Sequence, residues 1–234
     1  MDQDAIDNTR ILFEQWEIYE AVIRHNYMLH RELVESFARC CQRVPAQGRI
    51  VDLGCGDGWL AWNVLRAIPF EQYLGVDVSE AAIERAATRF REWNGRFTLR
   101  NGDLAAQLME IPDSSVDLVL ASYSIHHFQE EAKRAVIAHV ARVLKPGGLF
   151  LWADVMRRDE ENYRQAVDRV THRIRTECEA MTERQREMAV EHVESSDFPE
   201  SVEWMTQAAA QVGMSLEQSL VQDPNYAAFA FAKT

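Results

Sequence analysis

A short apolar segment that runs into three closely spaced glycines is the feature that most constrains what this chain can fold into. Residues 50–53 are apolar apart from one acid, and glycines follow at alternate positions, Gly54, Gly56 and Gly58. An apolar run of this length that ends in glycine is typical of a buried strand. Residues 59–67 then have a helical pattern that ends before Pro69. Glycines between a strand and a helix allow a tight turn and a close approach to a ligand, because no side chain intervenes.

The alternation of strand and helix continues along the middle of the chain. Further strands are expected at residues 73–78, 97–100, 116–121 and 149–155, with helices at 80–93 and 130–144. Ser79 is a favourable N-cap for the first of these helices. This spacing predicts an α/β fold in which a mostly parallel sheet carries helices on both faces.

Helical segments flank this alternating core. Before it, apolar residues between positions 9 and 43 recur at steps of three and four, which predicts one or two amphipathic helices. After it, the charged pattern of residues 159–194 indicates two inserted helices, and a further helix is expected at 202–212. Strands at 216–221 and 226–231 form a candidate hairpin around a Pro-Asn turn.

We therefore expect a single domain over residues 1–234. It would comprise an N-terminal helical lid, a ligand-binding core, a helical insertion, and a C-terminal helix with a strand hairpin. The respective boundaries are 1–45, 46–156, 157–200 and 201–234.

Composition excludes several classes of protein. Apolar residues make up 47% and charged residues 26% of the 234 residues, which is ordinary for a globular chain and excludes wholesale disorder. Lys and Arg number 25 against 37 Asp and Glu, so the net charge is −12. A nucleic-acid partner is disfavoured, because a phosphate backbone would be repelled by such a surface.

The cysteines and the first residues point to a cytoplasmic protein. The sequence begins without a basic segment followed by an apolar one, and it has no run of about 18 apolar residues, so neither a secretory signal nor a membrane span is expected. The four cysteines include no C-x-x-C pair. We expect reduced thiols rather than disulfides or a zinc site.

Two acids follow strands in places where a nucleotide could use them. Asp77 ends the second expected strand, where a carboxylate can accept hydrogen bonds from ribose hydroxyls. Asp103 lies just past the third strand, where it could accept from an adenine amino group. The Gly-x-Gly-x-Gly spacing does not fit the Gly-x-Gly-x-x-Gly frame of a dinucleotide site. The alternative for each feature taken singly is a turn glycine or a helix cap.

These residues carry a resemblance to a known family. Residues 49–155 resemble the core of class I S-adenosylmethionine-dependent methyltransferases. Five segments are similar to the motifs of that family, in the same order and at similar spacing. They are Val51–Gly58, Asp77, Asn101–Leu104, Asp117–Ser122 and Arg142–Gly148.

The resemblance implies a Rossmann-like sheet of seven strands whose last strand is antiparallel. It implies binding of S-adenosyl-L-methionine and release of S-adenosyl-L-homocysteine. The glycine loop would cradle the methionine part, an acid beneath it would lie near the amino group, and an acid after the second strand would bind the ribose. Apolar residues would flank the adenine, whose amino group would meet a third acid, and a serine would line the floor. The cofactor-binding residues expected from the family are Asp52, Gly54, Cys55, Gly56, Gly58, Asp77, Val78, Asp103, Leu104 and Ser122.

Candidate catalytic residues lie where the acceptor would be bound. His126 and His127 directly follow the fourth strand, at the sheet edge where ligands bind in such folds, and His126 is favoured because it comes first. Asp154 ends the fifth strand, where it could orient a substrate cation or act as a base. For these residues, packing histidines and a solvated strand-end acid are the alternatives.

The N-terminal stretch supplies two more candidates. Tyr27 and His30 are three positions apart, which predicts a shared helix face, and members of the family often carry a lid helix here. We expect both to face the substrate, with core packing of Tyr27 as the alternative.

The insertion is a second candidate lid. Its arginines, among them Arg173 and Arg175, could bind an anionic group, although their balance with glutamates favours a solvated face. His192 and residues 195–199 are candidates for closing over the pocket. Since Asp154 has no evident second and third oxygen partner in the sequence, we expect no metal.

The leading functional hypothesis is in-line transfer of a methyl group to a small molecule. A tRNA or protein methyltransferase is an alternative, but residues 121–124 read Ala-Ser-Tyr-Ser where amino-methylating nucleic-acid enzymes usually carry Asn/Asp-Pro-Pro-Tyr. A non-catalytic nucleotide-binding or partner-binding module and, less favoured, a nicotinamide oxidoreductase are further alternatives. The acceptor atom, whether O, N, C or S, and the oligomeric state stay open.

Overall fold

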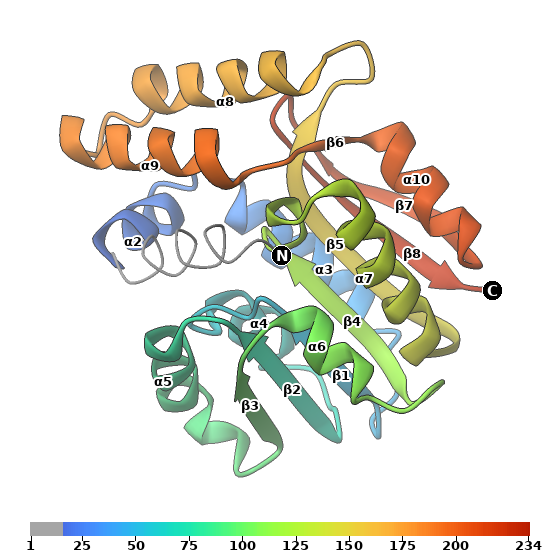
Figure 1. Ribbon diagram of the computed structural model, residues 1–234. Helices are drawn as coiled ribbons and strands as arrows, with labels where there is room; N and C mark the ends of the chain where they lie inside the picture. The colour runs from blue at the N-terminus through green and yellow to red at the C-terminus, as the bar shows by residue number, and fades with distance from the viewer. Residues whose placement is uncertain (1–15) are drawn as a thin grey trace.

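The computed structural model describes residues 16–234 (Figure 1). The beginning of the predicted amphipathic stripe, at residues 9–15, lies outside the described residues. Eight strands are present in the described part of the chain: β1 (Arg49–Leu53), β2 (Gln72–Asp77), β3 (Phe97–Asn101), β4 (Val116–Ser122), β5 (Leu144–Arg157), β6 (Glu200–Ser201), β7 (Met214–Gln222) and β8 (Tyr226–Lys233).

These strands form one mixed sheet in the order β3-β2-β1-β4-β5-β8-β7, with the two-residue β6 pairing beside β5. β1 pairs in parallel with both β2 and β4, and β4 pairs in parallel with β5. The last strand, β8, is antiparallel to both of its neighbours. The α/β class, the mostly parallel sheet and the antiparallel last strand are thereby confirmed. Because parallel strands share one carboxyl edge, the loops after β1, β2, β4 and β5 come together there.

Nine α-helices lie in the described residues: α2 (Trp16–Arg24), α3 (His30–Cys41), α4 (Trp59–Leu65), α5 (Glu80–Arg89), α6 (Leu104–Met109), α7 (Glu130–Val143), α8 (Tyr163–Glu177), α9 (Glu183–Ser196) and α10 (Val202–Gln211). Sequence signals set several of their ends. The hydroxyl of Ser79 accepts a hydrogen bond from the Ala82 N–H, as its predicted capping role requires. Reciprocal capping boxes begin α8 at Asn162 and α9 at Thr182.

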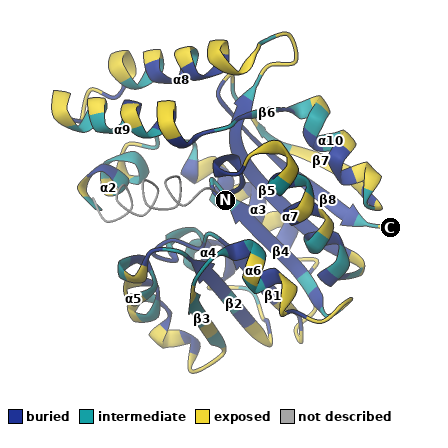
Figure 2. Ribbon diagram, viewed as in Figure 1, coloured by how far each residue is buried: buried dark blue, intermediate teal, exposed yellow. Residues whose placement is uncertain are grey.

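Two apolar layers hold the sheet between its helices. One layer packs α6, α7 and α10 against one face, through residues such as Leu108, Val140 and Met205. The other packs α3, α4 and α5 against the opposite face, through residues such as Phe37, Ala61 and Ala86. The central strands are therefore buried along most of their length, while the outward faces of the helices are exposed (Figure 2).

The helices α2, α8 and α9 lie together beyond the carboxyl edge of the sheet, with α8 beside α9 (Figure 1). They belong to the N-terminal segment and to the insertion, which are the segments that interrupt the alternating pattern. Within residues 16–234, no helix combines the length and the low charge that a membrane span requires. All four cysteines are buried and unpaired.

One helix was missed, and two local predictions are wrong. Helix α6 was not expected, because six residues are too few for a clear period. Strand β5 begins at Leu144, opposite Val116 of β4, and includes the Pro-Gly-Gly segment that was expected to separate it from α7. That segment lies at a register shift, and regular pairing with β4 and β8 resumes at Leu149. Tyr27 does not share a helix face with His30, because it lies in the turn between α2 and α3.

Candidate functional site

A cavity of about 170 Å³ lies at the carboxyl ends of β1, β4 and β5, beneath α2, α8 and α9. We call it the first cavity. Apolar side chains from the three covering helices form much of its wall, among them Ile18, Val22, Val170, Ile174 and Val193. The strands and the loops after them contribute its polar groups. The site is thus a concave, mainly apolar pocket with polar groups at its floor, which is the usual form of a small-ligand site.

The glycine loop forms one end of this cavity. Gly54, Gly56 and Gly58 have φ values of +75°, +55° and +74°, which favour glycine. A Cβ on Gly54 would lie 2.4 Å from the Cβ of Ser124, and one on Gly58 would lie 2.3 Å from the ring of Phe90. Packing therefore requires those two glycines, and Gly58 lines neither this cavity nor the next.

Gly56 is different, because a Cβ there would meet only the hydroxyl of Tyr19, at 3.6 Å. The missing side chain leaves an open cradle that faces the first cavity. Cys55 lines the same cavity beside it. A ligand can therefore approach the backbone at this point of the loop.

Asp52 lies beneath the glycine loop and lines the first cavity. Its carboxylate accepts a hydrogen bond from the hydroxyl of Tyr73 at 2.7 Å. Burial raises the pKa of Asp52 to about 7, even though the bond from Tyr73 favours the ionised form. Ser122, at the end of β4, lines the same cavity.

A second, smaller cavity of about 40 Å³ adjoins the first, and both are lined by Gly54, Tyr123 and His127. Its wall includes four residues predicted to bind the adenosyl part, namely Asp77, Val78, Asp103 and Leu104. The structure thus places these four residues around one hollow, although they come from two different strand ends.

Asp77 connects the second cavity to the glycine loop. One carboxylate oxygen accepts from the Gly56 N–H at 2.8 Å and the other from the Ser79 N–H at 2.9 Å. Burial raises the pKa of Asp77, against the effect of these amide bonds. Asp103 accepts from the Ala106 N–H at 2.9 Å and caps α6. Asp103 is therefore a helix cap, as the alternative predicted, and it also lines the second cavity.

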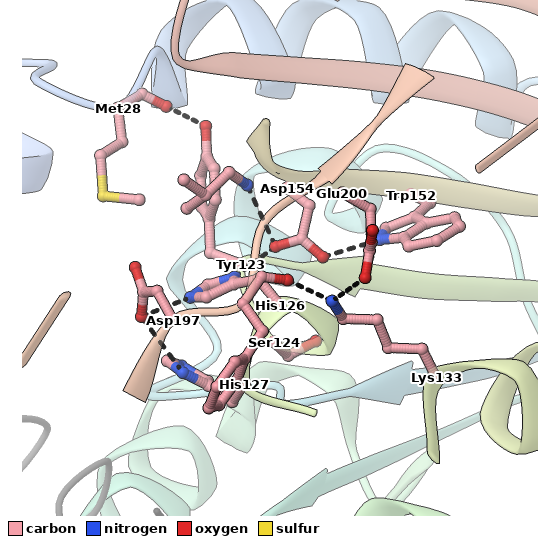
Figure 3. A network of polar contacts seen from close by, with 12 residues as sticks. Met28, Tyr123, Ser124, His126, His127, Lys133, Trp152, Asp154, Asp197 and Glu200 are labelled. Carbon is pink, nitrogen blue, oxygen red and sulfur yellow. Dashed lines mark hydrogen bonds and ion pairs between the residues drawn. The ribbon is translucent and has the colours of Figure 1, made fainter. Parts of the chain in front are cut away.

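His126 lies between two carboxylates at the edge of the first cavity (Figure 3). Its Nδ1 hydrogen-bonds to Asp154, and its Nε2 is 3.4 Å from Oδ1 of Asp197. Burial lowers the pKa of His126, but Asp197 and Asp154 outweigh it and raise the value to about 10. Burial acts to raise the pKa of Asp197, yet His126 holds it well below its usual range. The carboxylates thus favour the protonated form of the ring, and the ring favours the ionised form of Asp197.

Asp154 does not line the first cavity, which corrects the expectation that it faces the substrate. One oxygen of its buried carboxylate bonds to His126, and the other accepts from the indole N–H of Trp152 at 2.8 Å. The carboxylate is almost fully buried. Asp154 is therefore placed to orient His126.

Asp197 and His192 are the residues of the cavity wall to which sequence reasoning assigned no chemical role. They lie on α9 and just after it, far along the chain from His126 and His127. Burial lowers the pKa of His192 to about 3, and burial together with His126 lowers that of His127. The run of acids and histidines at the end of an inserted helix was the available signal, but nothing in the sequence specified the contact.

Tyr27 and His30 both line the first cavity, although they come from a turn and a helix start. The hydroxyl of Tyr27 accepts a hydrogen bond from the Ala180 N–H at 2.9 Å, which ties this turn to the α8–α9 connection. The ring of His30 packs against Trp59 and Tyr123, with ring centroids 5.9 and 5.5 Å away. Burial lowers the pKa of His30 to about 4.

Tyr123 is a further residue that sequence reasoning missed. It has φ +55° directly after β4, and it lines both cavities. Its hydroxyl donates to the backbone carbonyl of Met28 (Figure 3). It therefore connects the N-terminal cover to the floor of the site.

The arginines of the insertion do not contribute to the first cavity. Arg173 pairs with Asp223 at 2.7 Å and with Glu177 at 3.0 Å, while Arg175 pairs with Glu187 at 3.1 Å on the surface. The structure therefore agrees with the interpretation that these arginines lie on a solvated, ion-paired face, and not with binding of an anionic group in the cavity.

Comparison with known proteins identifies a methyltransferase domain in the middle of the chain. The family described as "Methyltransferase domain" matches residues 50–148, which contain the glycine loop, both strand-end acids and His126. An uncharacterised methyltransferase of Geobacillus kaustophilus is 28% identical over 160 residues, which cover 67% of this chain and 71% of that protein. The uncharacterised methyltransferase YcgJ of Bacillus subtilis is 34% identical over 110 residues, covering 47% of this chain and 41% of YcgJ.

A solved structure agrees with the architecture. The crystal structure of YcgJ superposes with a TM-score of 0.61 at 17% identity, over 85% of this chain and 98% of that chain. The strand order, the glycine loop and the matched family all indicate a methyltransferase fold. Residues 50–148 of this chain are therefore similar to the methyltransferase domain family, and the whole fold agrees with that similarity.

Proposed function

We propose that this enzyme transfers a methyl group from S-adenosylmethionine to a small, largely apolar acceptor bound in the first cavity. The observation that carries this proposal is the cavity itself, which opens onto the glycine loop and is covered by α2, α8 and α9. A covered pocket of this size suits a compact molecule better than a nucleic-acid strand or a protein surface.

The residues around the two cavities suit the two ends of S-adenosylmethionine. The open cradle at Gly56 and the acid at Asp52 suit a zwitterionic methionine end, because backbone and carboxylate can approach it without a side chain between them. Asp77 and Asp103 suit the hydroxyls and amino group of an adenosyl part. When bound, this group supplies a methyl that its sulfonium has already activated.

The chain's own residues then orient the acceptor and exclude water. Apolar residues of the covering helices, such as Ile18 and Ile174, hold the acceptor body and keep water out. His126, fixed by Asp154, and the neighbouring Tyr27 and His30 present polar atoms to the acceptor. In-line positioning of the acceptor atom is the principal contribution we assign to the protein.

The nucleic-acid and protein alternatives receive less support. The net charge of −12 and the ion-paired arginines of the insertion leave little positive charge for a polyanion near the cavity. A non-catalytic binding module stays an alternative, and it would bind S-adenosylhomocysteine without transferring a methyl group.

The test is a substitution that fills the part of the cavity assigned to the acceptor and lies away from the glycine loop. Ile174 lines the cavity from α8, whereas Thr176 on the same helix is exposed. We expect Ile174→Trp to lower methyl transfer to the best acceptor of a small-molecule panel at least about tenfold. S-adenosylhomocysteine affinity should stay within about twofold, measured by calorimetry.

Thr176→Trp is the matched control and should change neither quantity. Unchanged transfer in Ile174→Trp would place the acceptor elsewhere. Tight S-adenosylhomocysteine binding without transfer to any panel member, but with transfer to tRNA or protein, would overturn the proposal.

A further inference from the structure

One carboxylate oxygen in the first cavity is surrounded by three histidine nitrogens. Oδ1 of Asp197 lies 3.4 Å from Nε2 of His126, 3.5 Å from Nδ1 of His127 and 3.5 Å from Nε2 of His192. Asp197 is 3% exposed, and its Oδ1 has no hydrogen-bond partner among the described residues. Nδ1 of His192 is likewise buried without such a partner in residues 16–234.

These separations match the edges of a metal coordination shell. Donor atoms held about 2.0–2.1 Å from a tetrahedral ion lie about 3.4 Å from one another. The ligand atoms of His126, His127 and Asp197 all lie within 4.8 Å of each other. The donors therefore need only small shifts to share one ion.

The surroundings of His126 have the form of a metal-ligand support. Ligating histidines commonly donate their second ring nitrogen to a carboxylate, which fixes the ring and raises its basicity. In this protein Nδ1 of His126 hydrogen-bonds to Asp154, and Trp152 in turn holds Asp154 (Figure 3). Nε2 is thereby directed toward Asp197 and the cavity.

We propose that His126, His127 and Asp197 form a binding site for a divalent first-row transition-metal ion. His192, whose Nε2 lies 3.5 Å from Oδ1 of Asp197, joins as a fourth donor after a shift of its side chain. Imidazole and carboxylate together suit Zn²⁺, Fe²⁺, Co²⁺ and Ni²⁺, and disfavour Ca²⁺ and Mg²⁺. Taking up an ion releases the proton from Nε2 of His126, because a metal-ligating imidazole is neutral. At His127 the ion replaces the hydrogen bond between Nδ1 and the Ser196 carbonyl, 3.2 Å away. This inference reverses the expectation from sequence that no metal binds.

The site has a consequence for the acceptor. All four donors line the first cavity, so an ion held by them faces the space assigned to the acceptor. An acceptor that presents an oxygen or nitrogen lone pair could complete the coordination shell. This part of the inference rests on the proposed function, whereas metal binding itself does not.

The test uses the full chain without an affinity tag, freed of metal with a chelator. Titration with Co²⁺ is followed by visible absorption, and titration with Zn²⁺ by calorimetry. We expect one ion per chain, and Co²⁺ bands typical of four or five nitrogen and oxygen ligands. Asp197→Ala and His126→Ala should each weaken binding at least about tenfold, and Asp154→Asn about tenfold to a hundredfold.

His172→Ala, an exposed histidine on α8, is the control and should bind both ions as the wild type does. Asp197→Asn, which keeps the shape of the side chain, carries the test if Asp197→Ala does not fold. Circular dichroism and S-adenosylhomocysteine binding check each variant. A wild-type chain that binds neither ion overturns the proposal, and so does binding that survives in folded Asp197 and His126 variants. A wild-type chain that binds the metal ion but not S-adenosylhomocysteine would count against the proposed function and leave the metal site supported.

Discussion

The imidazole of His126 hydrogen-bonds through Nδ1 to the carboxylate of Asp154, which joins the loop after β4 to the end of β5. The second oxygen of that carboxylate is held by Trp152. The ring of His126 therefore has a defined orientation, with Nε2 directed to the cavity side and to Asp197. The consequences of this and three other relationships can be measured.

Replacing the carboxylate behind His126 should separate transfer from cofactor binding. We expect Asp154→Asn to lower kcat at least about tenfold, equivalent to about 1.4 kcal/mol of transition-state stabilisation, because the ring loses its fixed orientation. Affinity for S-adenosylhomocysteine should change by less than about twofold. Asp168→Asn, an exposed site on α8, is the control. Equal losses in kcat and in cofactor affinity would indicate a structural role instead.

Adding one methyl group at Gly56 should block the cradle. Gly56→Ala should weaken S-adenosylhomocysteine binding at least about tenfold, because the new Cβ would occupy the open space that faces the cavity. Gly95→Ala is the matched control, since Gly95 also has a positive φ, +79°, and has open space around its Cβ position. Both variants should lose about 1–2 kcal/mol of stability through backbone strain. Equal affinities of Gly56→Ala and Gly95→Ala for S-adenosylhomocysteine, measured by calorimetry, would contradict the proposal that the ligand binds at the Gly56 cradle.

Asp77 should contribute both to the stability of the glycine loop and to binding of the ribose of the cofactor. Asp77→Asn keeps the size of the side chain but replaces one of the two oxygens that accept from Gly56 and Ser79. We expect a stability loss of about 1–3 kcal/mol, because a buried amide loses its acceptor. Affinity for S-adenosylhomocysteine should fall at least about tenfold, as followed by ligand-dependent thermal stabilisation. Wild-type affinity in this variant would show that the ribose lies elsewhere.

Acid should destabilise the fold through His30. Burial holds its pKa at about 4 in the folded chain, below the ordinary value of 6.5, so the unfolded chain takes up a proton first as the pH falls. The contribution to stability is complete above pH 6.5 and is lost between pH 6.5 and 4, by up to about 1.4 kcal/mol per pH unit. Denaturant unfolding between pH 6.5 and 4 should show that the free energy of unfolding falls less steeply with pH in His30→Leu than in the wild type. A parallel decline in both would contradict the assignment, and exposed His172→Ala serves as the control.

Much of the part of the site proposed to bind the cofactor was predictable from local sequence. The glycine loop, the acids after β2 and β3, and the apolar residues beside them each lie within a few residues of a strand end. Once β1 and β2 pair in parallel, their carboxyl ends meet, and the residues that follow them must be neighbours. Ser79 was equally predictable, because a helix N-cap depends on atoms three residues away.

The part of the site proposed to bind the acceptor was predictable only in part. His126 could be placed at the cavity because it follows a core strand, but its two carboxylate partners come from β5 and from the end of α9. Tyr27 reaches the cavity from a turn rather than a helix, and its partner Ala180 lies in a distant connection. Spacing along the chain carries no information about such contacts.

The sequence by itself determined the alternation of strands and helices, the glycine loop, the acid that ends β2 and the acid that follows β3. These features depend on interactions within one or two elements, so local spacing specifies them. Only the tertiary structure decided that α2, α8 and α9 close over the carboxyl edge, that Asp154 lies behind His126, and that Asp197 and His192 meet the two histidines after β4. Those contacts join segments far apart in the chain, and they exist only because the apolar faces of the covering helices pack over the sheet edge.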